Sequence, residues 1–251
     1  MQLLTLSVGN TKLAKDTLIL SIPAGKTCPG ASLCKSMAVI DLATLKRKIK
    51  DGPLTEFRCF AASAEVQYDN VYLARKRNLD LIMQAIKDGT LVSLIEESIK
   101  KKRTKKTMKI RIHEGGDFFS LAYLLAWIEV AKRNPCLDFY CYSKSLNFFL
   151  GLELPSNFFM TASKGGKFDS LIEEGHFPRF AEVFMYEEDA TAAGLQVDHD
   201  DSHCFMPGPF ALIVHAGQPK GSDWGKAVRE NRKAGKFSGY NKETKKVFAT
   251  V

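Results

Sequence analysis

Short apolar segments alternate with longer segments of helical periodicity between residues 108 and 222, and this alternation limits the fold more than any other feature of the sequence. The short segments have the length and composition of β-strands and cover 108–113, 137–142, 157–162, 180–185 and 210–215. Segments of helical character lie at 118–133, 168–174 and 187–193. Because such strands pair in parallel through crossover helices, the sequence predicts the α/β class, with an open parallel sheet or a partial (β/α) barrel.

The first hundred residues follow a different pattern. Residues 2–8 and 16–22 are β-type segments around Gly9 and Asn10, which predicts an antiparallel hairpin. A cysteine loop follows, residues 39–57 are predicted to be an excursion, and helical periodicity covers 62–88 and 91–102. The length of 251 residues predicts a single α/β domain. Its predicted parts are a hairpin and cysteine loop (1–61), a helical part (62–103), βα units (108–222) and a basic tail (220–251).

Half of the six cysteines, Cys28, Cys34 and Cys59, lie within 32 residues. A proline and a glycine between the first two allow the sharp turn that points two thiols at one centre. Thiolates bind zinc or hold iron–sulfur clusters, and clustered cysteines in a reducing compartment favour metal over disulfides. We therefore expect a metal site at these three cysteines, with Cys204 as a candidate fourth ligand.

The identity of that metal stays open at the level of the sequence. The spacing C-x5-C-x24-C is neither a pair of zinc-ribbon CxxC motifs nor the compact CxxxCxxC motif of four-iron clusters. Structural zinc is one alternative. In another, the three cysteines are small buried hydrophobic residues without a metal, which is also the role that we expect for Cys136 and Cys141.

The loops that follow the predicted strands contain ionisable and glycine residues, and in parallel sheets such loops meet at one edge. They cover 113–117, 142–144, 163–166 and 215–218. From these loops we expect a small-molecule site with contacts from Glu114, Gly115, Gly116, Asp117, Lys144 and His215. An ordinary helix cap is the alternative for Asp117. A satisfied core or rim position is the alternative for His113, and the run Asp198–His203 is predicted to be an exposed polar loop.

The net charge of +8 comes from two segments. Lys100–Lys109 contributes +7 and the tail from Lys220 to Lys246 contributes +6, so the remainder of the chain carries −5 (8 − 7 − 6). Such runs are often solvated helix ends, but they also suit nucleic acid or an acidic host protein. The N-terminus lacks the features of a secretory signal, and no apolar run has the ~18–20 residues of a membrane span. We therefore expect a cytoplasmic protein that makes no contact with a membrane.

Several stretches together resemble the phage gene product 88 family. In chain order from Thr27 to Ser222 they are TCPGASLCKSMA, FRCFAAS, RIHEGGDFFSLAYLLAW, FYCYSKS and FALIVHAGQPKGS. The resemblance implies a virus- or prophage-encoded protein, host-cytoplasmic during infection, from a family without an assigned activity. Many members of that family have the third cysteine in a Cys-Tyr-Ala setting soon after the second. Here Ala38 occupies that region, and Cys59-Phe60-Ala61 takes over after an insertion.

A more distant likeness is to radical S-adenosylmethionine proteins, which share three early cysteines, a Gly-Gly-acid turn after a strand and a partial βα barrel. This likeness implies a four-iron cluster on Cys28, Cys34 and Cys59, with Gly115–Asp117 near the amino group of S-adenosylmethionine. The sequence thus predicts an iron–sulfur protein, with a radical reaction on a small ligand as its candidate activity. The alternative is a non-enzymatic structural-zinc module that binds nucleic acid or a host protein through its basic segments.

Overall fold

A seven-stranded sheet forms the centre of the computed structural model, which describes residues 2–9, 13–215 and 217–236. The strands are β1 (Leu6–Val8), β2 (Thr17–Leu20), β5 (Lys109–Ile112), β6 (Asp138–Ser143), β7 (Phe158–Ser163), β8 (Phe180–Phe184) and β9 (Phe210–Ile213). They lie in this order across the sheet, with β1 antiparallel to β2 and every other pair parallel. Because β1 and β9 are its two edges, the sheet is open and does not form a closed barrel. The prediction of an α/β fold with an N-terminal hairpin is confirmed.

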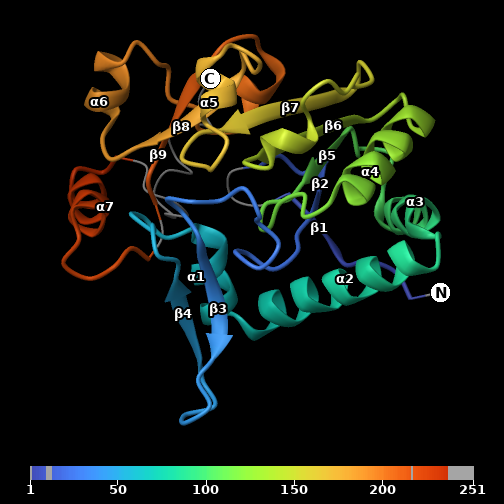
Figure 1. Ribbon diagram of the computed structural model, residues 1–251, viewed down its shortest axis with the longest axis horizontal. Helices are drawn as coiled ribbons and strands as arrows, with labels where there is room; N and C mark the ends of the chain where they lie inside the picture. Colours follow the sequence, from blue (N-terminus) through green and yellow to red (C-terminus); the bar gives the residue numbers. More distant parts are fainter. Residues whose placement is uncertain (1, 10–12, 216, 237–251) are drawn as a thin grey trace.

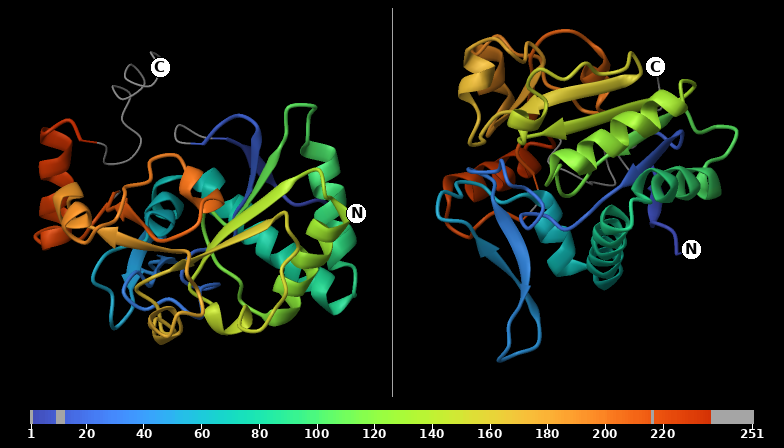
Figure 2. Two further views of the ribbon diagram at one scale, coloured as in Figure 1. Left: turned by 90° about the horizontal axis from the view of Figure 1, so that it is seen from above. Right: turned by 45° about the vertical axis from the view of Figure 1, so that its right-hand side comes forward.

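Helices α2, α3 and α4 cover one side of the sheet (Figures 1 and 2). The helices are α1 (Phe60–Gln67), α2 (Asp69–Lys87), α3 (Leu91–Lys102), α4 (Leu121–Arg133), α5 (Ser170–Glu173), α6 (Glu187–Ala192) and α7 (Asp223–Lys233), with 3-10 turns at η1 (Leu146–Phe148) and η2 (Ser202–Phe205). The main core lies between these helices and the sheet, and it includes Ile82, Ile95 and Trp127. In the described part of the chain, no helix has the length and apolar character needed to cross a bilayer.

Strand residues alternate between this core and the other face of the sheet. Ile110 and Ile112 of β5 are fully buried in the main core, whereas Arg111 and the following His113 line a pocket on the opposite face. In β6, Cys141 likewise packs in the main core, whereas the residues on either side of it pack in a separate cluster on the other face. Since successive side chains of a strand point to opposite faces, one apolar strand serves both the core and the pocket.

Residues 39–57, predicted to be an excursion, contain additional β-structure. They lie largely in a two-stranded antiparallel hairpin of β3 (Ser36–Ile40) and β4 (Arg47–Asp51), which projects from the body of the protein (Figure 1). The predicted helix 62–88 is also two helices, because Tyr68 adopts an extended conformation (φ −122°, ψ 117°) between α1 and α2. Apolar periodicity continues across this break, so a pattern of spacing cannot reveal it.

Candidate functional site

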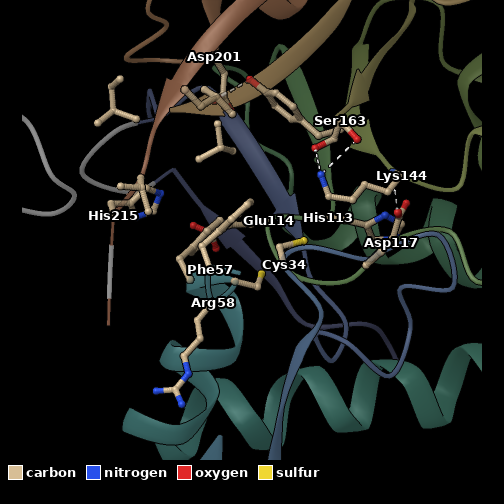
Figure 3. Close-up of a pocket in the computed structure, with 18 of the residues that line it drawn as sticks. Cys34, Phe57, Arg58, His113, Glu114, Asp117, Lys144, Ser163, Asp201 and His215 are labelled. Atoms are coloured by element: carbon tan, nitrogen blue, oxygen red, sulfur yellow. Dashed lines mark hydrogen bonds between the residues drawn. The ribbon is translucent and has the colours of Figure 1, made fainter. Parts of the chain in front are cut away.

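A pocket on the face of the sheet away from α3 and α4 brings together most of the predicted site residues (Figure 3). Its cavity measures about 240 Å³. The predicted residues that line it are Cys28, Cys34, Cys59, Glu114, Gly116, Asp117, Lys144 and His215. Parallel strands place their carboxyl ends at one edge, which explains why loops far apart in the sequence meet here.

The loop Cys28–Cys34 is fixed against the ends of β6 and β7. The amide of Leu33 donates to the carbonyl of Gly165 at 3.0 Å. The approach is closest at Gly30, where an added Cβ would lie 2.0 Å from the carbonyl oxygen of Lys144. Glycine is therefore needed at this position so that the cysteine loop can seat on the sheet.

Cys59 reaches the same pocket from the start of α1, where it is the N-cap residue. Its backbone amide donates to the hydroxyl of Ser36 at 3.0 Å. The thiol makes no capping hydrogen bond, yet the amides of Ala61 and Ala62 face it closely enough to lower its pKa, against the larger effect of burial. Amides at a helix N-terminus stabilise a thiolate, so this position suits an anionic sulfur ligand.

The three pocket thiols influence one another electrostatically. Burial, followed by the charges of Asp117, Cys59 and Cys34, raises the pKa of Cys28 well above its usual range. Burial and the neighbouring Cys34 raise the pKa of Cys59 to about 11. Cys28 and Cys59 are therefore neutral thiols at neutral pH, and a metal that binds them as thiolates must release protons.

This protonation predicts slow alkylation of Cys28 and Cys59 in reduced, metal-free protein. With a pKa of about 11, only ~0.1% of Cys59 is thiolate at pH 8, and the thiolate is the reactive form. We expect iodoacetamide to label the exposed Cys136 first. Labelling of Cys59 should accelerate about tenfold for each pH unit up to pH 11. Peptide mass spectrometry measures both rates, and equal labelling of the two cysteines at pH 8 would contradict the assignment.

Asp117 and Lys144 join the ends of β5, β6 and β7. The Asp117 carboxylate accepts hydrogen bonds from the hydroxyl of Ser143 at 2.7 Å and from the amide of Lys144 at 2.9 Å, while burial raises its pKa. The Lys144 ammonium donates to the hydroxyl of Ser163 at 2.7 Å, to its carbonyl at 3.2 Å and to the carbonyl of Lys164 (Figure 3). These acceptors use all three ammonium protons, so Lys144 positions the wall and has no spare donor for a ligand.

The two glycines of the Gly-Gly-Asp turn make room for buried neighbours. A Cβ on Gly115 would lie 2.7 Å from the guanidinium of Arg75, and one on Gly116, whose φ is +91°, would lie 2.3 Å from a buried isoleucine side chain. Arg75 pairs with the buried Glu65 at 2.9 Å and approaches Glu114 at 3.8 Å. The turn thus places Glu114 at the pocket wall, whereas Gly115 itself lies outside the lining.

His215 lies on the side of the pocket opposite Lys144 (Figure 3), with its ring 4.9 Å from the ring of Phe60. The side chain of Gln218 holds this loop to the segment before Cys59. It accepts from the amide of Arg58 at 2.8 Å and donates to the carbonyl of His215 at 3.0 Å. The Arg58 guanidinium extends away from the labelled cluster and pairs with a carboxylate of β4 at 2.7 Å.

A polar wall built from Arg111, Asp198 and Asp201 was not predicted as part of the site. Arg111 pairs with Asp201, and its guanidinium lies 4.7 Å from the ring centre of Tyr142, whose hydroxyl donates to both carboxylates. The prediction of an exposed polar loop is therefore wrong for Asp198 and Asp201, which are buried. The sequence contains one indication of this wall, because Arg111 is a charged residue within an apolar strand segment. It lies two residues before His113, so both side chains point to the same face of the sheet.

His113 is strained and buried at the wall of the pocket. It is not a glycine, yet its φ is +69°, a conformation that is unusual for such residues and clusters at functional sites. Its Nε2 lies 2.9 Å from the hydroxyl of Tyr123, while Nδ1 is buried and has no hydrogen-bond partner. Burial and the charge of Arg111 lower its pKa to about 3, so the ring is neutral at physiological pH.

The remaining cysteines do not belong to the pocket lining. Cys204, the candidate fourth ligand, is fully buried in a separate cluster with Tyr140 and Phe210. Cys141 is a core residue as predicted, but Cys136 is exposed, so its predicted core position is wrong. Among the residues that the structure describes, no three His, Cys, Asp or Glu side chains are already gathered tightly enough to hold a metal ion.

Comparisons with known proteins place the chain in a family. A family model described as Gene product 88 matches residues 3–237. The chain belongs to the Gene product 88 family. Over 90 residues it is 33% identical to the Gene 88 protein of Mycobacterium phage L5, an alignment that covers 34% of this chain and 38% of that protein. No solved structure matches the chain.

The family assignment confirms the first resemblance found in the sequence and supports a phage protein. Neither comparison supports the likeness to radical S-adenosylmethionine proteins. The names of the family and of the relative specify no biochemical activity.

Proposed function

We propose that Cys28, Cys34 and Cys59 hold an iron–sulfur cluster and that the rest of the pocket binds a small molecule beside it. The observation that carries this proposal is the convergence of three free thiols on one pocket, where Cys34 is close enough to raise the pKa values of Cys28 and Cys59. Three thiolate ligands leave one position of a four-iron cluster open for an outside ligand, and such a cluster supplies electron transfer.

The number of thiols in the pocket favours a cluster over a single structural zinc ion. Structural zinc takes four protein ligands. Three cysteines line the pocket, and Cys204, the candidate fourth ligand, lies in a separate core cluster. The amides of Ala61 and Ala62 beside Cys59 add the stabilisation that a ligated sulfur needs.

The charge of the pocket favours a cationic ligand. Carboxylates outnumber cations at its wall. The carboxylates are those of Glu114, Asp117, Asp198 and Asp201, and the cations that face the pocket are Arg111 and Lys144. The Arg58 guanidinium, the remaining arginine of the lining, extends away from the labelled cluster (Figure 3). S-adenosylmethionine carries an ammonium and a sulfonium group, and we propose it as the small molecule, with Glu114 and His215 of the pocket wall as its contacts.

Anaerobic reconstitution with iron and sulfide tests the cluster. We expect brown protein with absorbance at ~400 nm that bleaches with dithionite. Each of Cys28→Ser, Cys34→Ser and Cys59→Ser should lose most of the iron and the colour, whereas the exposed Cys136→Ser should retain both. Cys204→Ser tests the fourth ligand and should also retain the cluster. Colourless protein with one stoichiometric zinc would replace this proposal by the structural-zinc module.

Binding of S-adenosylmethionine is tested separately on reconstituted protein by equilibrium dialysis. S-adenosylhomocysteine, which lacks the sulfonium charge, should bind at least about tenfold more weakly, because the half-buried carboxylate of Glu114 loses its attraction to the sulfonium group. Glu114→Gln should remove most of that difference. If both compounds bind equally or neither binds, the cluster proposal stands and the ligand proposal fails.

A further inference from the structure

The segment Lys100–Lys106 carries the densest charge of the described chain, with six cations in seven residues, all of them exposed. Lys100, Lys101 and Lys102 form the last turn of α3, and Arg103 follows in an extended conformation. Cations in the last turn of a helix are favourable to its dipole, but that effect ends within the turn. It therefore does not account for Arg103, Lys105 and Lys106.

Local hydrogen bonds fix the turn that carries Lys105 and Lys106. The amide of Thr104 donates to the hydroxyl of Thr107 at 3.0 Å, and the amide of Lys106 donates to the hydroxyl of Thr104 at 3.2 Å. The backbone closes the same turn through the amide of Thr107 and the carbonyl of Thr104 at 3.0 Å. Lys105 and Lys106 are thus presented at the tip of an ordered turn, next to the cations of the helix end.

Glu96 and Glu97 of α3 line a hollow together with Lys100 and Arg103. Glu96 is engaged by Arg133 at 3.4 Å, and none of the recorded ion pairs of the described residues joins a carboxylate to Lys100–Lys106. Like charges at this density repel one another and destabilise the fold unless an anion neutralises them. A repeating anion is the partner that such a series of cations fits.

We propose that Lys100–Lys106 is a docking site for the phosphate backbone of nucleic acid. A protein partner is the weaker choice, because interfaces with proteins are built around apolar and aromatic anchors and this segment contains none. Phosphate contacts need only regularly spaced cations and give binding without sequence preference.

The position of the segment keeps this function separate from the pocket. It precedes β5 at Lys109, whereas His113 and Glu114 of the pocket follow the other end of the same strand. Bound nucleic acid therefore lies at the end of the sheet away from the cysteines. The tail, predicted from the sequence as a second basic segment, lies outside the described residues from 237 onward.

Fluorescence anisotropy with labelled duplex DNA of mixed sequence, measured over a range of salt concentrations, tests the proposal. The test variant is Lys101→Glu/Lys105→Glu/Lys106→Glu. The control is Lys46→Glu/Lys48→Glu/Lys50→Glu on the β3–β4 hairpin, which changes the net charge equally at another exposed site. We expect the test variant to weaken binding at least about tenfold and to reduce the salt slope by about 2–3, since each lysine contributes roughly one phosphate contact.

The control variant should keep more of the affinity and of the salt slope. Circular dichroism confirms that both variants are folded, and single-stranded DNA as the probe shows whether the duplex is preferred. Equal loss in the two variants would show attraction by net charge alone and would overturn the docking site. Absence of salt-dependent binding by the unmodified protein, or binding only to an acidic polypeptide, would overturn it as well.

Discussion

Gly30→Ala should lower the free energy of unfolding by about 3 kcal/mol or more, as expected for a rigid clash in a packed interior. The added Cβ would lie 2.0 Å from the carbonyl oxygen of Lys144 and 2.4 Å from its carbonyl carbon. This carbonyl cannot move aside easily, because Asp117 holds the amide of Lys144 and Ser163 holds its ammonium. The cysteine loop must therefore leave the ends of β6 and β7.

Thermal unfolding measures this effect, and we expect Tm to fall by roughly 6–12 °C for a chain of this size. Gly217→Ala is the matched control, because its Cβ would meet only the side chain of Ser63 at ordinary contact distance, 3.6 Å. Any iron that the unmodified protein takes up should also be lost from Gly30→Ala and kept by Gly217→Ala. Equal Tm values for the two variants would show that the loop is not seated as described.

His113 should make the protein sensitive to acid. Its pKa is about 3 in the folded protein and about 6.5 in an unfolded chain. Between these values the unfolded chain binds the additional proton, so the free energy of unfolding decreases as the pH falls, by about 1.4 kcal/mol per pH unit. The stability is fully present above pH 6.5 and is lost progressively toward pH 3. Over the whole window the loss is about 4–5 kcal/mol.

Urea unfolding at a series of pH values, with His113→Asn as the variant, measures this linkage. Asparagine tolerates the left-handed backbone at φ +69° and has no titrating group. Its slope below pH 6 should be shallower by about 1 kcal/mol per pH unit. Glu65 and Asp117, whose pKa values are raised by burial, contribute with the opposite sign in both proteins and cancel in the comparison. An unchanged slope in His113→Asn would contradict the assignment.

Secondary structure could be predicted where one face of a helix or strand is buried, because burial then repeats apolar residues at a regular spacing. The segment 91–102 was predicted with the bounds of α3, and the strands β5 to β9 lie within or one residue beyond their predicted ranges. The β3–β4 hairpin does not follow from the sequence pattern because its strands are short and are mostly half-buried or exposed, so no fully buried face imposes a period on them. The start of α4 was placed three residues early, since Ser120 rather than Asp117 caps the helix.

The amino-acid sequence alone determined the fold class, the family and the loops that surround the pocket, because apolar periodicity and strand ends are local properties. Tertiary structure alone decided what each polar residue in those loops does. The ammonium of Lys144 donates its hydrogen bonds to Ser163 and Lys164. Cys204 lies in a separate core cluster, and Arg111 forms an ion pair with Asp201 at the pocket wall. Hydrogen-bond partners and burial depend on residues far away in the chain, so local patterns cannot encode them.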